Sequence, residues 1–227
     1  MIRLSIFKLK YNKMLFKKSL RIGLPVGIQQ TAVAAGMMAL FWIVNEFGTN
    51  VIAAYSVAAR INSLATLPAM NFASALAAFV GQNMGAKKEF RVRSGYIATL
   101  KMSSVVSIVV TCVVLLFGRS IMDLFTEDPQ VIKIGREYLN IVGSFYLLFS
   151  AMFSTSGVLR GAGATFVPMV TTILSLWAIR LPGAYFLSQK YGEAGIWWAI
   201  PIGWFMGLIL SYGYYLTGKW KNKTVMG

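Results

Sequence analysis

Six long apolar segments alternate with short polar or charged turns along the chain. They lie at residues 22–45, 51–80, 94–117, 131–158, 164–187 and 195–217. A helix rises about 1.5 Å per residue, so about 20 apolar residues cross a hydrocarbon core of about 30 Å. The pattern therefore predicts an all-α membrane protein in which residues 22–217 form a bundle of six transmembrane helices.

The turn between the second and third segments orients this bundle. It contains Gly81-Gln82-Asn83-Met84-Gly85-Ala86 and continues through four basic residues to position 93. Glycine adopts backbone angles that other residues resist, so we expect Gly81 and Gly85 to let the chain reverse here. Short loops rich in Lys and Arg stay on the cytoplasmic side. We therefore place this turn in the cytoplasm.

The other basic residues follow the same asymmetry. Fifteen Lys and Arg fall on the predicted inner side, in residues 1–21, 87–93, Arg160 and 219–223, against four on the outer side. Six crossings bring both termini to one side, so we expect a multi-pass protein of the bacterial plasma membrane with both termini cytoplasmic. Residues 1–21 read as a basic amphipathic segment or an inter-lobe linker, and residues 218–227 as a basic tail.

Composition agrees with a membrane protein and excludes several kinds of site. The chain is 57% hydrophobic and 13% charged, whereas soluble domains carry about 25% charged residues. The net charge of +15 would suggest nucleic acid in a soluble protein, but these charges gather at helix ends, which favours membrane lipids over nucleic acid. With no histidine and one cysteine, Cys112, the chain alone forms no disulfide and no Cys/His zinc or nucleophile site. We expect no metal and no enzyme activity.

Seven short sequence motifs along the chain resemble those of a known protein family. They are Gly23-Leu24-Pro25, Ala58-Ala59-Arg60-Ile61, Gly81-Gln82-Asn83-Met84-Gly85-Ala86, Leu124-Phe125-Thr126-Glu127-Asp128-Pro129, Leu159-Arg160-Gly161-Ala162-Gly163, Arg180-Leu181-Pro182 and Gly195-Ile196-Trp197. In this order they resemble helices seven to twelve of multidrug and toxic compound extrusion (MATE) transporters, within the superfamily that includes lipid-linked sugar flippases. The chain departs from the family at Ala164, Thr165 and Phe166, where an acidic and a basic residue commonly follow the turn.

The resemblance implies one lobe of a twelve-helix transporter, with a substrate cleft between two six-helix lobes. The implied function is the C-terminal half of a multidrug efflux antiporter, coupled to H⁺ or Na⁺, that exports lipophilic, often cationic compounds. Its partner would be the N-terminal six-helix half, absent from this chain, or a second copy. The alternatives are half of a lipid-linked oligosaccharide flippase, and a non-transporting membrane scaffold or inert truncated product.

The position of the acidic residues bears on ion coupling. Ion-coupled export needs a buried group that binds and releases the ion, yet Glu46 and Glu137 lie near the outer ends of their segments. One branch of the resembling family carries carboxylates in helices seven and ten, and the matching interiors, 29–44 and 140–156, have none. We therefore expect the coupling ion, H⁺ or Na⁺, to bind outside this half, and no other cofactor.

The family resemblance places the cleft wall on the first, second and fourth segments. The polar, methionine and aromatic candidates there are Gln29, Gln30, Met37, Phe41, Asn62, Met70, Asn71, Asn140 and Tyr146. Methionine and aromatic side chains suit varied lipophilic cations. At helical spacing the same residues also suit ordinary packing or lipid contact.

Two arginines and one proline stand out inside the apolar segments. Arg60 and Arg180 each lie about 12 Å from the outer surface at about 1.5 Å per residue. Arginine at that depth faces a bundle interior or a watery cleft. We expect both to be buried structural charges paired with helix carbonyls or Glu46, with substrate contact as the alternative. Pro68 is expected to kink its helix, either as a gating hinge or as a packing bend.

The topology is testable by cysteine labelling in a Cys112→Ser background. Lys88→Cys should react with a membrane-impermeant maleimide only in inside-out vesicles, and Asp128→Cys should react in intact cells, because the charge asymmetry places these positions on opposite sides. Labelling of position 88 from outside, or of position 128 only from inside, would overturn the predicted topology.

Overall fold

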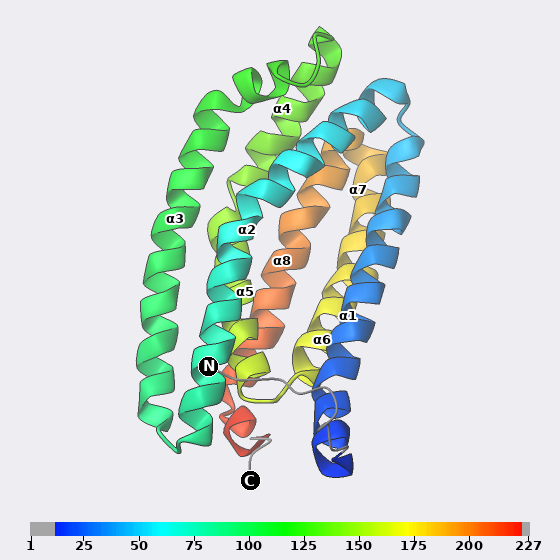
Figure 1. Ribbon diagram of the computed structural model, residues 1–227. Coiled ribbons are helices and arrows are strands. Elements are labelled where there is room, and N and C mark those ends of the chain that lie inside the picture. Colours follow the sequence, from blue (N-terminus) through cyan, green and yellow to red (C-terminus); the bar gives the residue numbers. More distant parts are fainter. Residues whose placement is uncertain (1–11, 224–227) are drawn as a thin grey trace, which may run out of the picture.

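The computed structural model describes residues 12–223, which are helical apart from short turns (Figure 1). In chain order the elements are α1 (Lys13–Asn45), α2 (Thr49–Gly85), α3 (Glu89–Asp123), α4 (Pro129–Gly143), α5 (Tyr146–Gly161), α6 (Phe166–Ile173), the π-helix η2 (Leu174–Arg180), α7 (Leu181–Tyr191), α8 (Glu193–Leu216) and the 3₁₀-helix η3 (Lys219–Lys223). Residues 1–11 and 224–227, which hold parts of the predicted basic segment and tail, lie outside the described residues. α1 begins at Lys13, so the end of the basic segment forms the first turns of this helix.

The helices confirm a six-span bundle. Five helical stretches are long and apolar enough to cross a membrane, and α4 with α5 makes a sixth if this bent pair is one span. Both described ends of the chain lie at the same end of the bundle, which agrees with an even number of crossings (Figure 1). The turns at residues 86–88 and 162–165 lie at this end too, and we name it the inner end after the topology predicted from the charges.

The fourth span, predicted at 131–158, consists of two helices joined by a bend that the sequence did not indicate. α4 and α5 meet at an angle of 49°, at a Gly-Ser pair of the kind that often kinks helices. The break frees carbonyl groups, and these find side-chain partners. Thr111 of α3 donates its hydroxyl to the carbonyl oxygen of Gly143 over 3.0 Å, and Ser144 donates to that of Asn140 over 2.7 Å. Such partners are what a helix break inside a membrane requires.

The fifth span also departs from a regular helix. Residues Leu174–Arg180 form a π-helix between α6 and α7. Pro182 follows two residues later and has no backbone N–H to donate to the preceding turn. π-helical turns are rare and frequently lie at functional sites.

After α2 the chain reverses its direction at Lys87, a residue that the sequence did not indicate. Gly81 and Gly85 remain within α2, and the left-handed residue is Lys87, with φ of 57°. The prediction that these glycines reverse the chain is therefore wrong. Gly81 serves packing instead, because a Cβ at this position would lie 3.4 Å from the carbonyl oxygen of Gly161 on α5.

α2 and α5 pack backbone to backbone in the bundle interior. A Cβ at Gly157 would lie 2.6 Å from the carbonyl oxygen of Ala73, and a Cβ at Gly161 would meet the backbone of Ala77 and the side chain of Val80. Helices in membranes associate through close packing, which small residues permit. α5 also packs against α3 and α8, so it forms the centre of the bundle.

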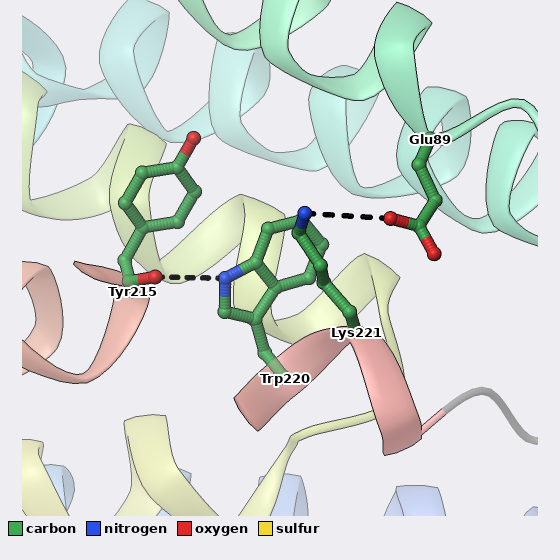
Figure 2. A network of polar contacts seen from close by, with 4 residues as sticks. All are labelled: Glu89, Tyr215, Trp220 and Lys221. Carbon is green, nitrogen blue, oxygen red and sulfur yellow. Dashed lines mark hydrogen bonds and ion pairs between the residues drawn. The ribbon is translucent and has the colours of Figure 1, made fainter. Parts of the chain in front are cut away.

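The C-terminal segment closes the inner end of the core (Figure 2). Trp220 is buried against residues of α2, α3 and α5, and its indole Nε1 donates to the carbonyl oxygen of Tyr215 over 2.9 Å. Its ring stacks on that of Tyr215 at 5.5 Å. The ammonium of Lys221 lies 3.4 Å from a carboxylate oxygen of Glu89, at the start of α3. These contacts hold η3 against the turn between α2 and α3.

α1 lies at the edge of the bundle, on the opposite side from α3 (Figure 1). It packs mainly against α6 and contacts α2 much less. Trp177 of η2 donates its indole N–H to the carbonyl oxygen of Ala32 over 3.1 Å, and Leu176 packs against Gly36. α1 is thus held by the fifth span rather than by its neighbour in sequence.

Gly157→Ala should destabilise the bundle by about 1–3 kcal/mol, because the added methyl group must push α5 away from the α2 backbone. Gly213→Ala on α8 is the matched control, since a Cβ there meets nothing within 4 Å. That change should be neutral or stabilise by up to about 1 kcal/mol, the helix propensity gain. Thermal unfolding of the purified chain in detergent measures both, and equal unfolding temperatures for the two variants would contradict the close contact.

Candidate functional site

One face of α2 is exposed along most of its length. The exposed residues on this face recur at alternating intervals of four and three residues, and Asn71 lies next to one of them. This α2 face consists of Ser56, Arg60, Ser63, Leu67, Met70, Asn71 and Ser74. This interval keeps the residues on one side of the helix, and we call the resulting row a seam. Within the described residues no second helix covers this seam.

The serine hydroxyls of the α2 face are already satisfied. Ser56, Ser63 and Ser74 each donate to the carbonyl oxygen four residues earlier, over 2.8 to 2.9 Å. Bonded in this way, the hydroxyls can lie against a partner helix without losing hydrogen bonds to water. The α2 face is therefore suited to close contact as well as to a polar cleft.

The two predicted glutamines of α1 have different positions. Gln29 is half-buried, and its amide donates to the hydroxyl of Thr172 over 2.7 Å and more weakly to the carbonyl oxygen of Pro168 over 3.4 Å. Gln30 is exposed. Gln29 thus joins α1 to α6 and is engaged in structure, whereas Gln30 is free to meet a ligand or a partner.

The apolar candidates of α1 and α2 lie on or near the exposed surface. Met37 and Met70 are exposed by 44% and 37%, and Phe41 is half-buried with its ring 6.2 Å from that of Tyr55. Asn71 is exposed on the α2 face, and Pro68 is half-buried within the continuous helix α2, which changes direction along its length (Figure 1). Whether Pro68 acts as a hinge stays a prediction.

The remaining candidates do not join this surface. Tyr146 is buried in the core, with its ring 6.5 Å from that of Trp204. Asn140 is exposed, but on α4, which lies on the other side of α2 from α1 (Figure 1). Gln30 and Met37 are thus exposed on α1, and Met70 and Asn71 on α2, whereas Tyr146 lies in the core and Asn140 on α4.

Asn140 instead lines an outer cleft of about 850 Å³ between the end of α3 and α4. The other lining residues are Arg119, Asp123, Thr126, Glu127, Pro129, Ile132, Lys133, Arg136 and Glu137. Its lining has as many acidic as basic side chains, so it has no dominant charge. In the sequence, the only signal of this cleft is the cluster of charged residues between positions 119 and 137, which does not indicate a cleft.

In the described chain, α2 and α5 carry buried polar atoms without partners, a set that the sequence predicted only in part. The two helices pack closely, with Ala73 opposite Gly157. Within the described part of the chain, Asn62 Oδ1, the Tyr146 hydroxyl and the hydroxyls of Ser150 and Ser154 are buried without a hydrogen-bond partner. Buried polar groups of this kind commonly hold ordered water.

The two arginines expected to be buried have different surroundings. Arg60 lies exposed on the α2 face, so the prediction that it is a buried charge is wrong for this bundle. Its position one helical turn after Ser56 turns it outward. Arg180 is half-buried, and its Nε is buried without any hydrogen-bond partner among the described residues. The expected pairing of Arg180 with helix carbonyls or Glu46 is therefore not found in residues 12–223.

A family model and two similar proteins agree on the family of this chain. The family model MatE matches residues 25–186. The chain is 32% identical over 202 residues to the probable multidrug resistance protein YpnP of Bacillus subtilis, covering 89% of this chain and 45% of that protein. It is 30% identical over 222 residues to the probable multidrug resistance protein NorM of Thermotoga maritima, covering 92% and 46%. The chain thus spans about half the length of the curated relatives it matches.

Solved structures show the same fold and the same coverage. A crystal structure of MATE in the bent conformation superposes with a TM-score of 0.88 at 21% identity, over all of this chain and 51% of that chain. An outward-facing multidrug resistance MATE family transporter of the MOP superfamily gives 0.88 at 22% identity, over 97% and 51%.

The difference between the two glutamines of α1 is testable. Gln29→Ala should lower the unfolding temperature of the chain, because the loss of its hydrogen bond to Thr172 removes about 1 kcal/mol. Gln30→Ala, the neighbouring control, should leave the unfolding temperature unchanged. If both variants unfold at the wild-type temperature, Gln29 does not hold α1 to α6.

Proposed function

The chain belongs to the MatE family, and from this premise we propose that it forms the C-terminal half of a cation-coupled multidrug efflux antiporter. Multidrug resistance homologues at 30% and 32% identity support drug efflux as the activity. The coverage of about half of each relative supports the assignment to one lobe.

The exposed α2 face carries this proposal. A helix seam of this length, with hydroxyls bonded to their own helix, is built to contact another helix layer. The second lobe is the N-terminal six-helix half, encoded separately or in a longer chain, or a second copy of this chain. Transport by alternating access requires two such bundles moving about a shared site.

The substrate proposed for this cleft is a small lipophilic cation. The exposed surface of α1 offers Met37, Met38 and Trp42, the last two exposed by 70% and 77%. Methionine and aromatic rings present soft, polarisable surfaces that attract organic cations. Gln30 on α1 and Asn71 on α2 are also exposed and add neutral hydrogen-bonding groups.

The coupling ion, H⁺ or Na⁺, is proposed to bind in the other lobe. The spans of this chain contain no carboxylate near mid-membrane, and Glu46 and Glu137 lie toward the outer end of the bundle. A buried carboxylate is the usual group for such coupling. Two copies of this chain would close a cleft without supplying one.

Cells that make only residues 1–227 should therefore show no ethidium efflux above cells with an empty vector, with or without a proton or sodium gradient. A fusion of the first six-helix half of YpnP to this chain should restore gradient-dependent efflux. Efflux from the chain alone would contradict the half-transporter proposal. A fusion that inserts in the membrane but does not transport would favour a scaffold role.

The α2 face can be tested in that fusion. Ser63→Trp should abolish efflux while protein abundance is maintained, because the bulky ring prevents close contact between the lobes. Val109→Trp on α3, also at an exposed position, is the matched control and should retain efflux. Equal efflux by both variants would remove the α2 face from the proposed lobe contact.

A further inference from the structure

The outer cleft between the end of α3 and α4 is lined by charged side chains that do not pair with one another. The cleft, of about 850 Å³, has three acidic and three basic lining residues, namely Asp123, Glu127, Glu137, Arg119, Lys133 and Arg136. Arg119 precedes Asp123 by four residues, and Lys133 precedes Glu137 by four, which is the spacing of ion pairs on a helix. Within the described residues, however, no two of these six side chains form an ion pair. Their charges are therefore available to a ligand in the cleft.

The two walls of the cleft are fixed by packing on the buried side of both helices. A Cβ at Gly135 of α4 would meet the side chain of Met122 of α3, and a Cβ at Gly118 would lie 3.8 Å from the side chain of Leu139. All four residues are buried. α3 and α4 thus hold their separation without any contribution from the charged residues, so the cleft exists before a ligand binds.

The turn beside the cleft is also fixed. The Asp128 carboxylate accepts hydrogen bonds from the backbone N–H groups of Gln130 over 2.8 Å and Val131 over 3.4 Å, which caps α4. The backbone N–H of Asp128 donates to the Thr126 hydroxyl over 3.2 Å. Asp128 is therefore engaged in the fold, whereas the side chain of its neighbour Glu127 bonds to no other residue in the described part of the chain.

The balance of charges indicates the class of ligand. A simple cation or anion in the cleft would lie beside three charges of its own sign, and like charges repel. A zwitterion meets both sets, because carboxylates accept hydrogen bonds from an ammonium group, and lysine and arginine donate them to a phosphate. The volume lies within the usual range of ligand sites, about 300–1,000 Å³, so the cleft is larger than a single ion needs.

The position of the cleft favours a membrane lipid over a dissolved molecule. The cleft lies at the end of the bundle opposite the described chain ends, where the membrane-spanning helix α3 ends (Figure 1). In the turn beside it, Leu124 and Phe125 are exposed by 82% and 51%, between the charged residues Asp123 and Glu127. Apolar and charged side chains in one segment suit the boundary between acyl chains and headgroups. The cleft is therefore at the depth of lipid headgroups.

We propose that the outer cleft binds the headgroup of a zwitterionic phospholipid that carries a primary ammonium group, as in phosphatidylethanolamine. The carboxylates accept hydrogen bonds from the ammonium group, and the arginine and lysine side chains donate to the phosphate. α3 and α4 of this chain build the site. The site thus goes beyond the proposed function and does not rest on transport or on a second lobe.

Thermal unfolding of the purified 227-residue chain in dodecyl maltoside tests the site, with circular dichroism as the readout. Dioleoyl phosphatidylethanolamine, phosphatidylcholine and phosphatidylglycerol are added to the micelles at equal mole fractions. Phosphatidylethanolamine should raise the unfolding temperature most, because a ligand that binds only the folded state stabilises it by mass action. The choline headgroup has no N–H donor for the carboxylates, and phosphatidylglycerol has no cationic group.

Glycerophosphoethanolamine carries the same zwitterion without acyl chains, so it separates the two sources of this chemistry. It should raise the unfolding temperature less than the lipid does at equal total concentration. A shift with glycerophosphoethanolamine and none with the lipid would assign the cleft to a dissolved molecule and overturn the lipid proposal.

Removal of two carboxylates should change the lipid preference. In the double variant Asp123→Asn/Glu127→Gln, the apparent affinity for phosphatidylethanolamine should fall about tenfold, as expected when two partly exposed ion pairs are lost together. Three basic residues then face only Glu137, so phosphatidylglycerol should become the better ligand. A purely structural role of the two carboxylates would lower the unfolding temperature without reversing the preference. Glu46→Gln, at an exposed position outside the cleft lining, is the matched control and should keep the wild-type preference.

Removal of two basic side chains should weaken binding without this reversal. Arg119→Gln/Arg136→Gln should lower the apparent affinity for phosphatidylethanolamine about tenfold and should not improve binding of phosphatidylglycerol. Arg60→Gln, exposed on the α2 face, is the matched control. All the substituted side chains are exposed, so both double variants should fold. If one does not fold, the other decides.

Two results would overturn the site. One is a wild-type unfolding temperature that phosphatidylethanolamine raises no more than the other two lipids do. The other is a preference for phosphatidylethanolamine that persists undiminished in the folded double variants. Neither result bears on efflux by a two-lobe transporter, so failure of this proposal is distinguishable from failure of the proposed function.

Discussion

Two glycines of α5 set the distance between the central helices of this bundle. At Gly157 and Gly161 the α5 backbone lies directly against Ala73 and Ala77 of α2, with no space for a Cβ atom. Within a bilayer, apolar side chains gain little by leaving lipid, so close backbone packing between small residues holds helices together. α5 also contacts α3 and α8, so this contact lies at the centre of four spans.

The same contact determines which side of α2 faces outward. With its small residues against α5, α2 presents Ser56, Arg60, Ser63, Leu67, Met70, Asn71 and Ser74 on the exposed side. α1 leaves this side uncovered because it is held by the fifth span, through Gln29 and Ala32. The packing of one helix thereby both builds the lobe and provides a surface for a second one.

Arg60 and Arg180 illustrate how tertiary structure separates residues that are equivalent in sequence. Each interrupts an apolar segment at a similar depth, and both were expected to be buried. Arg60 lies on the outward face of α2, whereas Arg180 lies at the end of a π-helix with its Nε buried. Arg180 also occupies space left by Gly203, which is distant in sequence and gives no local signal.

The sequence alone determined the number of spans and the location of both described chain ends at one end of the bundle, because span length and loop charge depend on local composition. Only the tertiary structure decided which face of each helix is inside. In lipid, an apolar residue that packs and one that faces the bilayer have the same character, so periodicity does not separate them. Gln29 and Gln30 are adjacent, yet one binds Thr172 and the other is exposed. The break at Ser144 likewise depended on Thr111, from another helix, to satisfy the freed carbonyl group of Gly143.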